Sequence, residues 1–462
     1  MLRHLQKALF ALTVAAAVHS AQAFSLIGPR EAWQTPEIGY DPLGFDIGGP
    51  LNLGEEYRWN LKTITYGIDE SFLNYFGQKG VDAVNKAFAI LNSLPAFSQM
   101  SANLAEFPTD TRRANYRASA LGLQDVKSAL LGMLTEELGL ASPERYAWTL
   151  RDRRVINAIP YYLVIKRNFD PVTLSPTPYV NGVLYTYGIL EFPGPWWDAI
   201  EVQVDPLASG FTAVASDIDS LVTSAAGSGA SGPGLGFGEF YAGLTRDDVG
   251  GLRYLYRASN VNTENVAAGA SLANSSSPWW PAGQTGGTNA PVGVSPRPGV
   301  DHLTFQQGRY DSMMGQFITQ TNQYQDTYIT NSTLVTQTIQ RVLTQPDILI
   351  SAEDLGLDGG GNPIFIRRTF AAAPVWINND ALNGQAALAG PGVISGPIVL
   401  TFNKIGPFIY NLGPFDGGSF LDEITGFGGW VWGSFDGTAN EPVVYPVGSS
   451  IQELEQQVLN SY

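Results

Sequence analysis

The chain of 462 residues contains no cysteine and only three histidines. The lack of cysteine excludes disulfide bonds, thiolate catalysis and cysteine-ligated metals. Beyond residue 23 the only histidine is His302, beside Asp301 at the start of an expected strand. One imidazole cannot form a three-histidine metal site. A Ser-His-Asp triad would also depend on His302, and no Gly-x-Ser-x-Gly motif presents a serine, so His302 is interpreted as a structural residue.

Basic residues are also few. The chain has 26 Lys and Arg against 42 Asp and Glu, which gives a net charge of −16, and no lysine occurs between Lys166 and Lys404. An acidic surface repels phosphate backbones, so nucleic acid is excluded as a partner. No apolar run beyond the N-terminal segment reaches the roughly 20 residues needed for a transmembrane helix. We therefore expect no transmembrane segment in the mature chain.

Residues 1–23 have the pattern of a secretory signal peptide. Two basic residues precede an apolar run, and Ala21-Gln22-Ala23 is a typical cleavage motif. Cleavage there would remove two basic and no acidic residues, so the mature charge is 24 − 42 = −18. An exported chain of this size without cysteine is typical of bacteria. The expected location is therefore secreted, either extracellular or periplasmic, in a bacterium.

The first half of the chain has the pattern of an α+β domain. Alternation predicts a strand over residues 63–68, and helical spacing of apolar residues predicts helices over 81–91 and 123–138. The dipeptide Asn181-Gly182 between two apolar runs predicts a β-hairpin. Residues 244–256 carry a Thr-x-x-Asp cap followed by a helical pattern.

The second half of the chain differs from the first in composition and in the pattern of its apolar residues. Residues 267–299 are rich in Ser, Gly, Pro and Asn and predict a linker. Beyond them, short apolar runs separated by turn residues are typical of a β-sandwich. We therefore divide the chain into a signal peptide (1–23), an extended N-terminal arm (24–53), an α+β domain (54–266), a Gly/Pro/Ser linker (267–299) and an all-β, sandwich-like domain with a short C-terminal helix (300–462).

Two segments of the first domain carry a resemblance to a known family. ITYGI followed by an amphipathic helix, and LTRDDVGGLRYLY at residues 244–256, resemble the opening and closing elements of the matrixin type of metzincin metalloprotease. The resemblance implies a metzincin-like fold over at most residues 57–257. The family places most of its strands between its first helix and its zinc helix, whereas only residues 98–122 separate the corresponding helices here. The opening pattern FSLIGP and DIGGPLNLGEEYRWN is similar to that of a group of uncharacterised exported bacterial proteins.

The zinc chemistry of the metzincin family is missing. Its zinc helix carries His-Glu-x-x-His, because residues four apart share one face of a helix, and a third histidine follows a glycine turn. The alignment through LGL at residues 138–140 places the first histidine on Gly132, the general base on Met133, the second histidine on Glu136 and the third on Ser142. These positions form a degenerate zinc helix, and no catalytic zinc is expected.

Oxygen ligands offer another candidate site. Asp354, Asp358 and Asn362 flank a glycine-rich loop that is compatible with Ca²⁺, although the spacing is not that of an EF-hand and an ordinary turn explains the same residues. Adjacent carboxylates such as Glu353-Asp354 and Asp422-Glu423 would suit glycoside hydrolysis, but the sequence selects none of these pairs. No cofactor is expected, and Ca²⁺ is the one ion with a candidate loop.

Paired tryptophans are candidate ligand-stacking aromatics. Trp430 and Trp432 share one face of an expected strand, where they could stack on sugar rings or be buried in a core. Trp279 and Trp280 lie in the linker, which favours exposure or docking onto a neighbouring surface.

These features favour a non-catalytic exported protein that acts in binding or as an extracellular surface or matrix component. Its partner would be a polysaccharide or a protein at the cell exterior. The alternative is a secreted hydrolase, either a metallopeptidase relative or a glycoside hydrolase that uses carboxylates alone. The oligomeric state is left open.

Overall fold

The structure is a computed structural model of the chain. It describes residues 23–26, 56–141, 143, 147–166, 168–180, 183–185, 187–191, 199–203, 235–273, 290–311, 313–355, 366–370, 376–378, 392–404, 408–410, 426–428 and 431–448. The predicted C-terminal helix, nearly all of the predicted signal peptide and most of the predicted N-terminal arm lie outside these ranges. No helix in the described ranges is long and apolar enough to cross a membrane.

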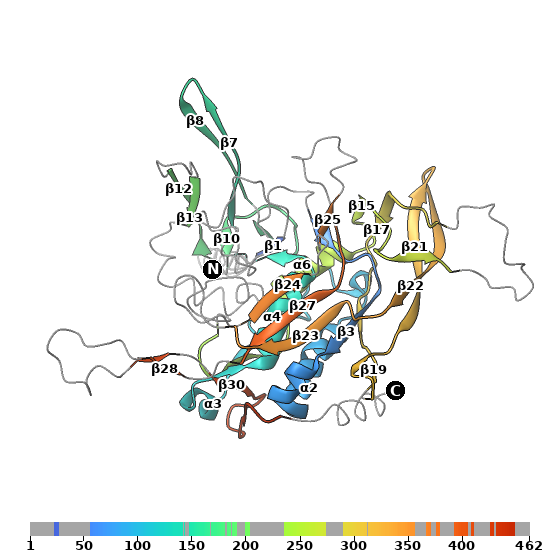
Figure 1. Cartoon of the computed structure of the whole chain (residues 1–462). Helices are drawn as coiled ribbons and strands as arrows, with labels where there is room; N and C mark the ends of the chain where they lie inside the picture. Colours follow the sequence, from blue (N-terminus) through green and yellow to red (C-terminus); the bar gives the residue numbers. More distant parts are fainter. Residues whose placement is uncertain are drawn as a thin grey trace, which may run out of the picture.

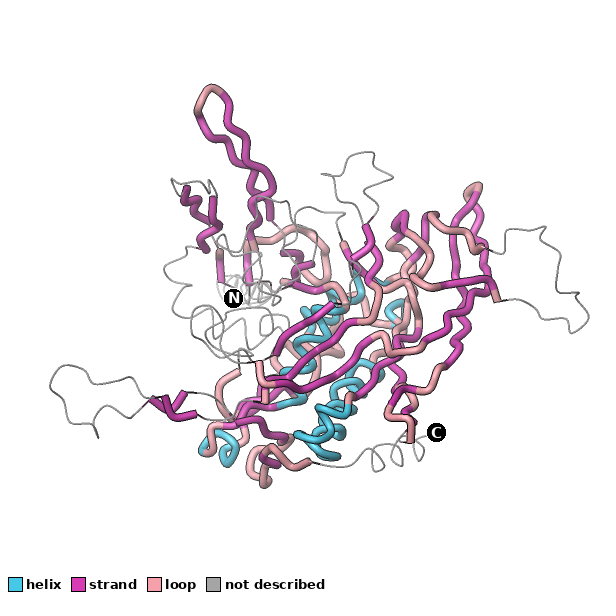
Figure 2. The backbone as a smooth tube through the Cα atoms, viewed as in Figure 1, coloured by secondary structure: helices cyan, strands magenta, loops and turns pink. Residues whose placement is uncertain are grey.

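The described part of the chain is a mixed α and β structure with few helices and many strands in several sheets, which agrees with the α and β content of the predicted α+β domain followed by an all-β domain (Figure 2). Its helices are α2 (Glu70–Asn92), α3 (Tyr116–Ala120), α4 (Val126–Glu137) and α6 (Arg246–Tyr256). The strands outside the central sheet are β1 (Phe24–Leu26), β2 (Tyr57–Arg58), β4 (Arg112–Ala114), β5 (Leu123–Asp125), β6 (Leu140–Ala141), β7 (Trp148–Ile156), β8 (Ile159–Lys166), β9 (Asn168–Phe169), β10 (Tyr179–Val180), β11 (Val183–Leu184), β12 (Tyr187–Glu191), β13 (Ala199–Gln203), β14 (Glu239–Tyr241), β15 (Val261–Glu264), β16 (Ala270–Leu272), β17 (Ser295–Pro298), β19 (Tyr310–Asp311), β20 (Gln316–Phe317), β21 (Gln320–Thr330), β22 (Thr333–Leu343), β25 (Trp376–Asn378), β26 (Gly392–Ile394), β28 (Phe408–Tyr410), β29 (Gly426–Gly428), β30 (Val431–Ser434) and β31 (Val443–Val444).

A five-stranded sheet lies at the centre, in the order β18-β3-β23-β27-β24 (Figure 1). Its strands are β3 (Thr63–Ile68), β18 (Thr304–Gln307), β23 (Ile348–Glu353), β24 (Ile366–Phe370) and β27 (Ile398–Asn403). The strands β18, β3, β23 and β27 are parallel to one another, and β24 pairs antiparallel with β27 at one edge of the sheet.

This sheet crosses the predicted domain boundary. Strand β3 precedes the predicted linker at 267–299, whereas its two neighbours β18 and β23 follow it. One hydrophobic cluster includes residues from both sides, among them Ile64 and Ile350. The predicted linker itself contains strands β16 and β17. The boundary therefore does not separate two cores, because strands far apart in sequence complete the sheet that β3 begins.

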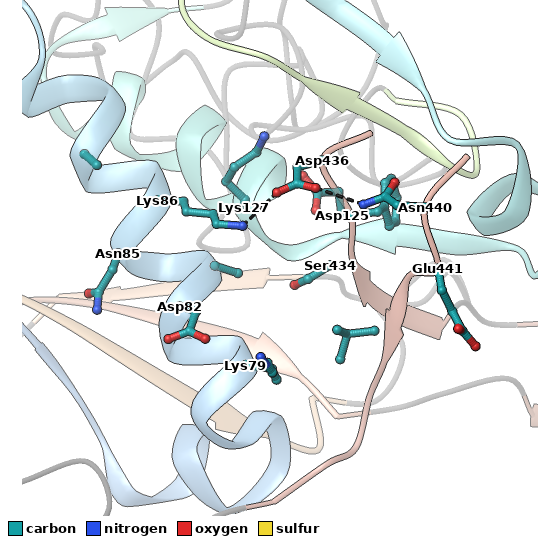
Figure 3. Close-up of a pocket in the computed structure, with 14 residues that line it drawn as sticks. Lys79, Asp82, Asn85, Lys86, Asp125, Lys127, Ser434, Asp436, Asn440 and Glu441 are labelled. Carbon is teal, nitrogen blue, oxygen red and sulfur yellow. Dashed lines mark hydrogen bonds and ion pairs between the residues drawn. The ribbon is translucent and has the colours of Figure 1, made fainter. Parts of the chain in front are cut away.

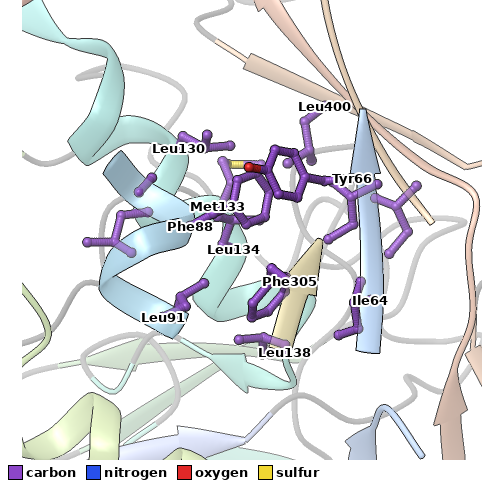
Figure 4. Packing of buried hydrophobic residues seen from close by; sticks show 14 of the residues in the cluster. Ile64, Tyr66, Phe88, Leu91, Leu130, Met133, Leu134, Leu138, Phe305 and Leu400 are labelled. Atoms are coloured by element: carbon purple, nitrogen blue, oxygen red, sulfur yellow. The ribbon is translucent and has the colours of Figure 1, made fainter. Parts of the chain in front are cut away.

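The core lies between this sheet and helices α2 and α4. Apolar side chains of both helices point toward the same face of the sheet (Figure 4). Phe88 of α2 stacks on Tyr66 of β3 with ring centroids 3.7 Å apart. Helix α4 begins at Val126 and not at residue 123 as predicted, because residues 123–125 form β5, which pairs in parallel with β30. All twelve residues of α4 are buried.

Two predicted local features are confirmed. Helix α6 has a capping box in which Thr245 accepts from the backbone of Asp248 while Asp248 accepts from the backbone of Thr245. Strands β10 and β11 pair antiparallel, as the Asn181-Gly182 dipeptide predicted.

A buried polar cluster ties distant elements together. Arg58 of β2 forms an ion pair of 2.8 Å with Glu264 of β15, and Arg297 of β17 forms one of 2.9 Å with Asp326 of β21. The guanidinium of Arg58 also donates to the carbonyl of Arg297. Burial raises the pKa of Glu264, while the charge and hydrogen bond of Arg58 oppose this.

Candidate functional site

The described positions of the predicted degenerate zinc helix lie inside the core. Gly132, Met133 and Glu136 are all buried in α4, and Met133, at the position of the general base, has 2% of its surface exposed. Its side chain points into the cluster that holds Tyr66 and Phe88 (Figure 4). Ser142 lies outside the described residues. This face of α4 therefore packs against apolar side chains.

Metal ligands do not converge elsewhere in the described ranges. Across them, no group of three or more His, Cys, Asp or Glu side chains is placed to hold a metal ion. The ring of His302 contacts the carbonyl of Leu94 at 3.2 Å, as expected for a structural residue. Of the candidate calcium loop, Asp354 is exposed, and Asp358 and Asn362 lie outside the described ranges.

Trp432 is a core residue and not a ligand-stacking surface. Only 1% of it is exposed, and its indole Nε1 donates to the carbonyl of Asn403 at 2.7 Å. Its ring packs edge-on against Phe402 and Phe76. Trp430, Trp279 and Trp280 lie outside the described ranges. Of the two predicted alternatives for Trp432, stacking on a ligand or burial in a core, the structure shows burial.

The open pocket of interest lies between α2, the start of α4 and the segment after β30. It has a volume of about 550 Å³, and we call it the α2–α4 pocket (Figure 3). It is lined by Lys79, Asp82, Ala83, Asn85, Lys86, Ala89, Asp125, Lys127, Ser434, Phe435, Asp436, Asn440, Glu441 and Val443. A volume of this size is within the range of small-molecule sites.

One wall of the pocket comes from α2. Lys79, Asp82, Lys86 and Ala89 follow one another at intervals of three or four residues, which places them on one face of the helix. The opposite face of α2 carries the apolar residues that pack on the sheet. The amphipathic pattern of this helix therefore positions the polar wall as well as the core.

Asp125 lies at the inner end of the pocket and is 1% exposed. It is the N-cap of α4, and its Oδ2 accepts from the backbone N–H of Ser128 at 3.0 Å and from the Ser128 hydroxyl at 2.5 Å. Its other oxygen, Oδ1, is fully buried, and the backbone N–H of Phe435 also interacts with this carboxylate. Burial raises the pKa of Asp125, although Lys127, Ser128 and the backbone amide of Phe435 oppose the shift.

Lys127 lies next to Asp125 at the inner end. Its Nζ donates to the carbonyl of Tyr241 at 2.6 Å and lies 5.0 Å from the centre of the Phe240 ring. Burial lowers the pKa of Lys127, while the negative charges of Asp125 and Asp436 oppose this. Lys127 is 7% exposed, so its ammonium is largely enclosed by these partners.

Asp436 stands at the rim and is engaged at both oxygens. Lys86 pairs with Oδ2 at 2.9 Å, and Asn440 donates to Oδ1 at 2.9 Å (Figure 3). The hydrogen bond from Lys86 lowers the pKa of Asp436, and Asn440 adds to the shift. Ser434 nearby shares a 2.7 Å hydrogen bond with the hydroxyl of Tyr445.

Asn115 holds the rim segment in place. It is fully buried and caps α3, where its Oδ1 accepts from the backbone N–H of Ala118. Its Nδ2 donates to the carbonyl of Gly437 at 2.6 Å and to the side chain of Asn440 at 2.8 Å. The rim is therefore anchored by a residue more than 300 positions earlier in the chain.

Sequence reasoning missed this pocket. The Asp-x-x-Ser pattern at residues 125–128 is a capping signal and could have shown that the helix starts after Asp125. No local signal pairs Asp125 with Asp436 or Lys86, because β5 and β30 meet only in the folded chain.

Comparison with known proteins gives no relative for this chain, since no family model, curated protein or solved structure matches it.

Proposed function

We propose that this chain is a non-catalytic exported protein that acts in binding, as an extracellular surface or matrix component, with the α2–α4 pocket as its ligand site. The observation that carries this proposal is that the middle and the N-terminal end of α4 lie in different surroundings. The positions that would bear zinc chemistry, including Met133, pack in the core, whereas the N-terminal end of the helix presents Asp125 and Lys127 to an open pocket.

A relationship to the matrixins is a further part of the proposal. Two facts support it: an expected strand and helix form β3 and α2, and the capped helix α6 begins with its capping box. The family places most of its strands before its zinc helix, whereas β18 and β23 follow α6 in this sequence. Strands β18 and β23 nevertheless pair directly with β3, so strand order along the chain is no obstacle to a related sheet.

A carboxylate-only glycoside hydrolase is the second candidate. One observation favours it: Asp125 and Asp436 line the same pocket, with the pKa of the first raised by burial and that of the second lowered by Lys86. Such a divergence is the pattern of a general acid beside an ionised carboxylate. Against it, both oxygens of Asp436 are held by Lys86 and Asn440, which leaves this carboxylate poorly placed to attack or activate water.

The test is a turnover assay on the purified mature chain. Casein and gelatin are incubated with and without added Zn²⁺, and polysaccharides are assayed for new reducing ends. We expect no turnover in either assay. Metal-dependent proteolysis would overturn the non-catalytic proposal, and release of reducing ends that is lost in Asp125→Asn would favour the glycoside hydrolase instead.

A further inference from the structure

Strand β21 forms the edge of its sheet among the strands that the structure describes. The sheet has the order β16-β22-β21, and β21 pairs with β22 without a register shift, in a hairpin at one side of the central sheet (Figure 1). The inner face of this hairpin is anchored. Tyr324 and Ile339 belong to the hydrophobic cluster of the core, and the side chain of Asn322 donates to the hydroxyl of Thr65 in β3. The edge is therefore held in place, so it loses little conformational entropy when it pairs with another strand.

The backbone groups of alternate β21 residues point away from β22. The carbonyl of Thr338 in β22 accepts from the backbone of Ala273, next to β16, so Thr338 does not exchange backbone hydrogen bonds with Gln325, its partner in β21. The carbonyl of Ile329 likewise points outward, where it accepts from the hydroxyl of Ser295. By the alternation of an antiparallel ladder, every second residue of β21 counted from Gln325 directs its N–H and C=O to the outer edge.

Three other edge strands in the described ranges carry features that hinder pairing. β16 has three residues, β17 carries Pro296 and Pro298, and β24 carries two adjacent arginines. Short length, proline and charge are common means by which proteins protect a sheet edge. β21 has eleven residues without proline, lysine or arginine, and its one charged residue, Asp326, is buried and paired with Arg297 at 2.9 Å. β21 therefore lacks the protection of these other edges.

A second copy of the chain meets no like charge at this edge. The chain has a net charge of −16, so two copies repel each other on average. The side chains of the outward-pointing β21 residues are Thr and Gln, with Ile329 near the turn. In an antiparallel pair about a two-fold axis at Gln325, this residue lies opposite its own copy, and Gln323 lies opposite Thr327 of the second copy. Each such pair can exchange two backbone hydrogen bonds, because the same groups point outward in both copies.

We infer that β21 pairs with β21 of a second copy, antiparallel about Gln325, which joins two three-stranded sheets into one continuous sheet in a homodimer. The inference goes beyond the proposed binding function, because it names a second copy of the chain as a partner. It depends neither on the α2–α4 pocket nor on a lack of catalysis. Turnover of a substrate would therefore overturn the proposed function and leave the dimer standing.

The test is sedimentation velocity on the full mature chain at concentrations up to about 100 μM. Gln325→Pro removes an outward N–H but no hydrogen bond to β22, and Gln325→Ala is the matched control that keeps this N–H. We expect the wild type to form a dimer with rising concentration. The dissociation constant of the dimer should rise at least about tenfold in Gln325→Pro and less than about threefold in Gln325→Ala.

A charged variant guards against a failure of the proline variant to fold. Gln325→Lys places two like charges opposite each other at the two-fold axis, so it should also weaken the dimer at least about tenfold. Urea unfolding of each variant shows whether the fold is retained. If Gln325→Pro does not fold, the comparison of Gln325→Lys with Gln325→Ala decides.

A single cysteine tests the geometry, since the chain has no cysteine of its own. Opposite residues of a hydrogen-bonded antiparallel pair have Cα atoms about 5.5 Å apart, which is within reach of a disulfide bond. Gln325→Cys should therefore form a disulfide-linked dimer when diamide oxidises the two thiols. Tyr116→Cys is the control, because Tyr116 is 72% exposed and belongs to α3, and it should cross-link at least about tenfold more slowly.

Several results would overturn the inference. One is a wild type that stays monomeric over the whole concentration range. Another is a dimer that Gln325→Lys leaves intact, since its interface then lies elsewhere. Equal weakening by Gln325→Ala and Gln325→Pro would place the contact on side chains and not on the backbone edge. Equal cross-linking of the two cysteine variants, or open polymers in place of a dimer, would exclude the two-fold arrangement.

Discussion

Replacement of Trp432 tests whether the paired tryptophans serve the core or a ligand. The indole is 1% exposed, and its Nε1 donates to the carbonyl of Asn403 at 2.7 Å. Its ring lies 5.2 Å from that of Phe402 and 6.4 Å from that of Phe76. Trp432 also belongs to β30, which leads into Ser434 and the rim of the α2–α4 pocket.

The expected cost follows from these contacts. Trp432→Ala leaves a cavity and removes two edge-on aromatic contacts, so the free energy of unfolding should fall by about 3–5 kcal/mol. Trp432→Phe keeps an aromatic ring but loses the donor to the Asn403 carbonyl, so we expect a smaller loss of about 1–2 kcal/mol. Tyr116→Ala is the control, because Tyr116 is 72% exposed and an exposed aromatic should change stability by less than about 0.5 kcal/mol.

The assay is urea unfolding followed by far-ultraviolet circular dichroism, which does not depend on the fluorescence of the replaced residue. The order Trp432→Ala, Trp432→Phe, Tyr116→Ala in decreasing loss of stability is the expected result. If Trp432→Ala lost less than about 1 kcal/mol while abolishing retention on a polysaccharide column, the core assignment would be refuted and the ligand-stacking hypothesis restored.

Three further predictions concern buried polar groups. Glu264→Gln leaves the buried guanidinium of Arg58 without its counter-charge and should lower the free energy of unfolding in urea by about 3–5 kcal/mol. The control Glu353→Gln, in an exposed ion pair, should lower it by less than about 1 kcal/mol. Equal losses of stability in the two variants would show that Glu264 is already neutral. Burial raises the pKa of Asp125, so the folded chain retains a proton that the unfolded chain releases near pH 4. The stability of the wild type should therefore fall, relative to that of Asp125→Asn, as the pH rises above about 4 through the folded-state pKa. Parallel curves of urea midpoint against pH for the two proteins would contradict this. Asn115→Ala should cost about 1–3 kcal/mol and speed amide hydrogen exchange at residues 436–441, whereas unchanged protection there would show that the rim does not depend on Asn115.

Local pattern was sufficient where an element's own residues decide its structure. Helical spacing predicted the buried stripe of α2, and the Thr-x-x-Asp signal predicted the N-cap of α6. The lack of a His-Glu-x-x-His motif around Gly132 and Met133 was also readable without a structure. Each of these features depends on residues that are at most a few turns apart, so periodicity and capping chemistry report them directly.

The central sheet, the pocket and the orientation of Trp432 depended on contacts between distant segments. A buried strand has the same apolar pattern whichever sheet it joins, so nothing local indicated that β18 and β23 would flank β3. Asp125 and Asp436 reach the same pocket only because β5 pairs with β30, more than 300 residues later. The sequence identifies these side chains, but the packing of the whole core determines which of them come into contact.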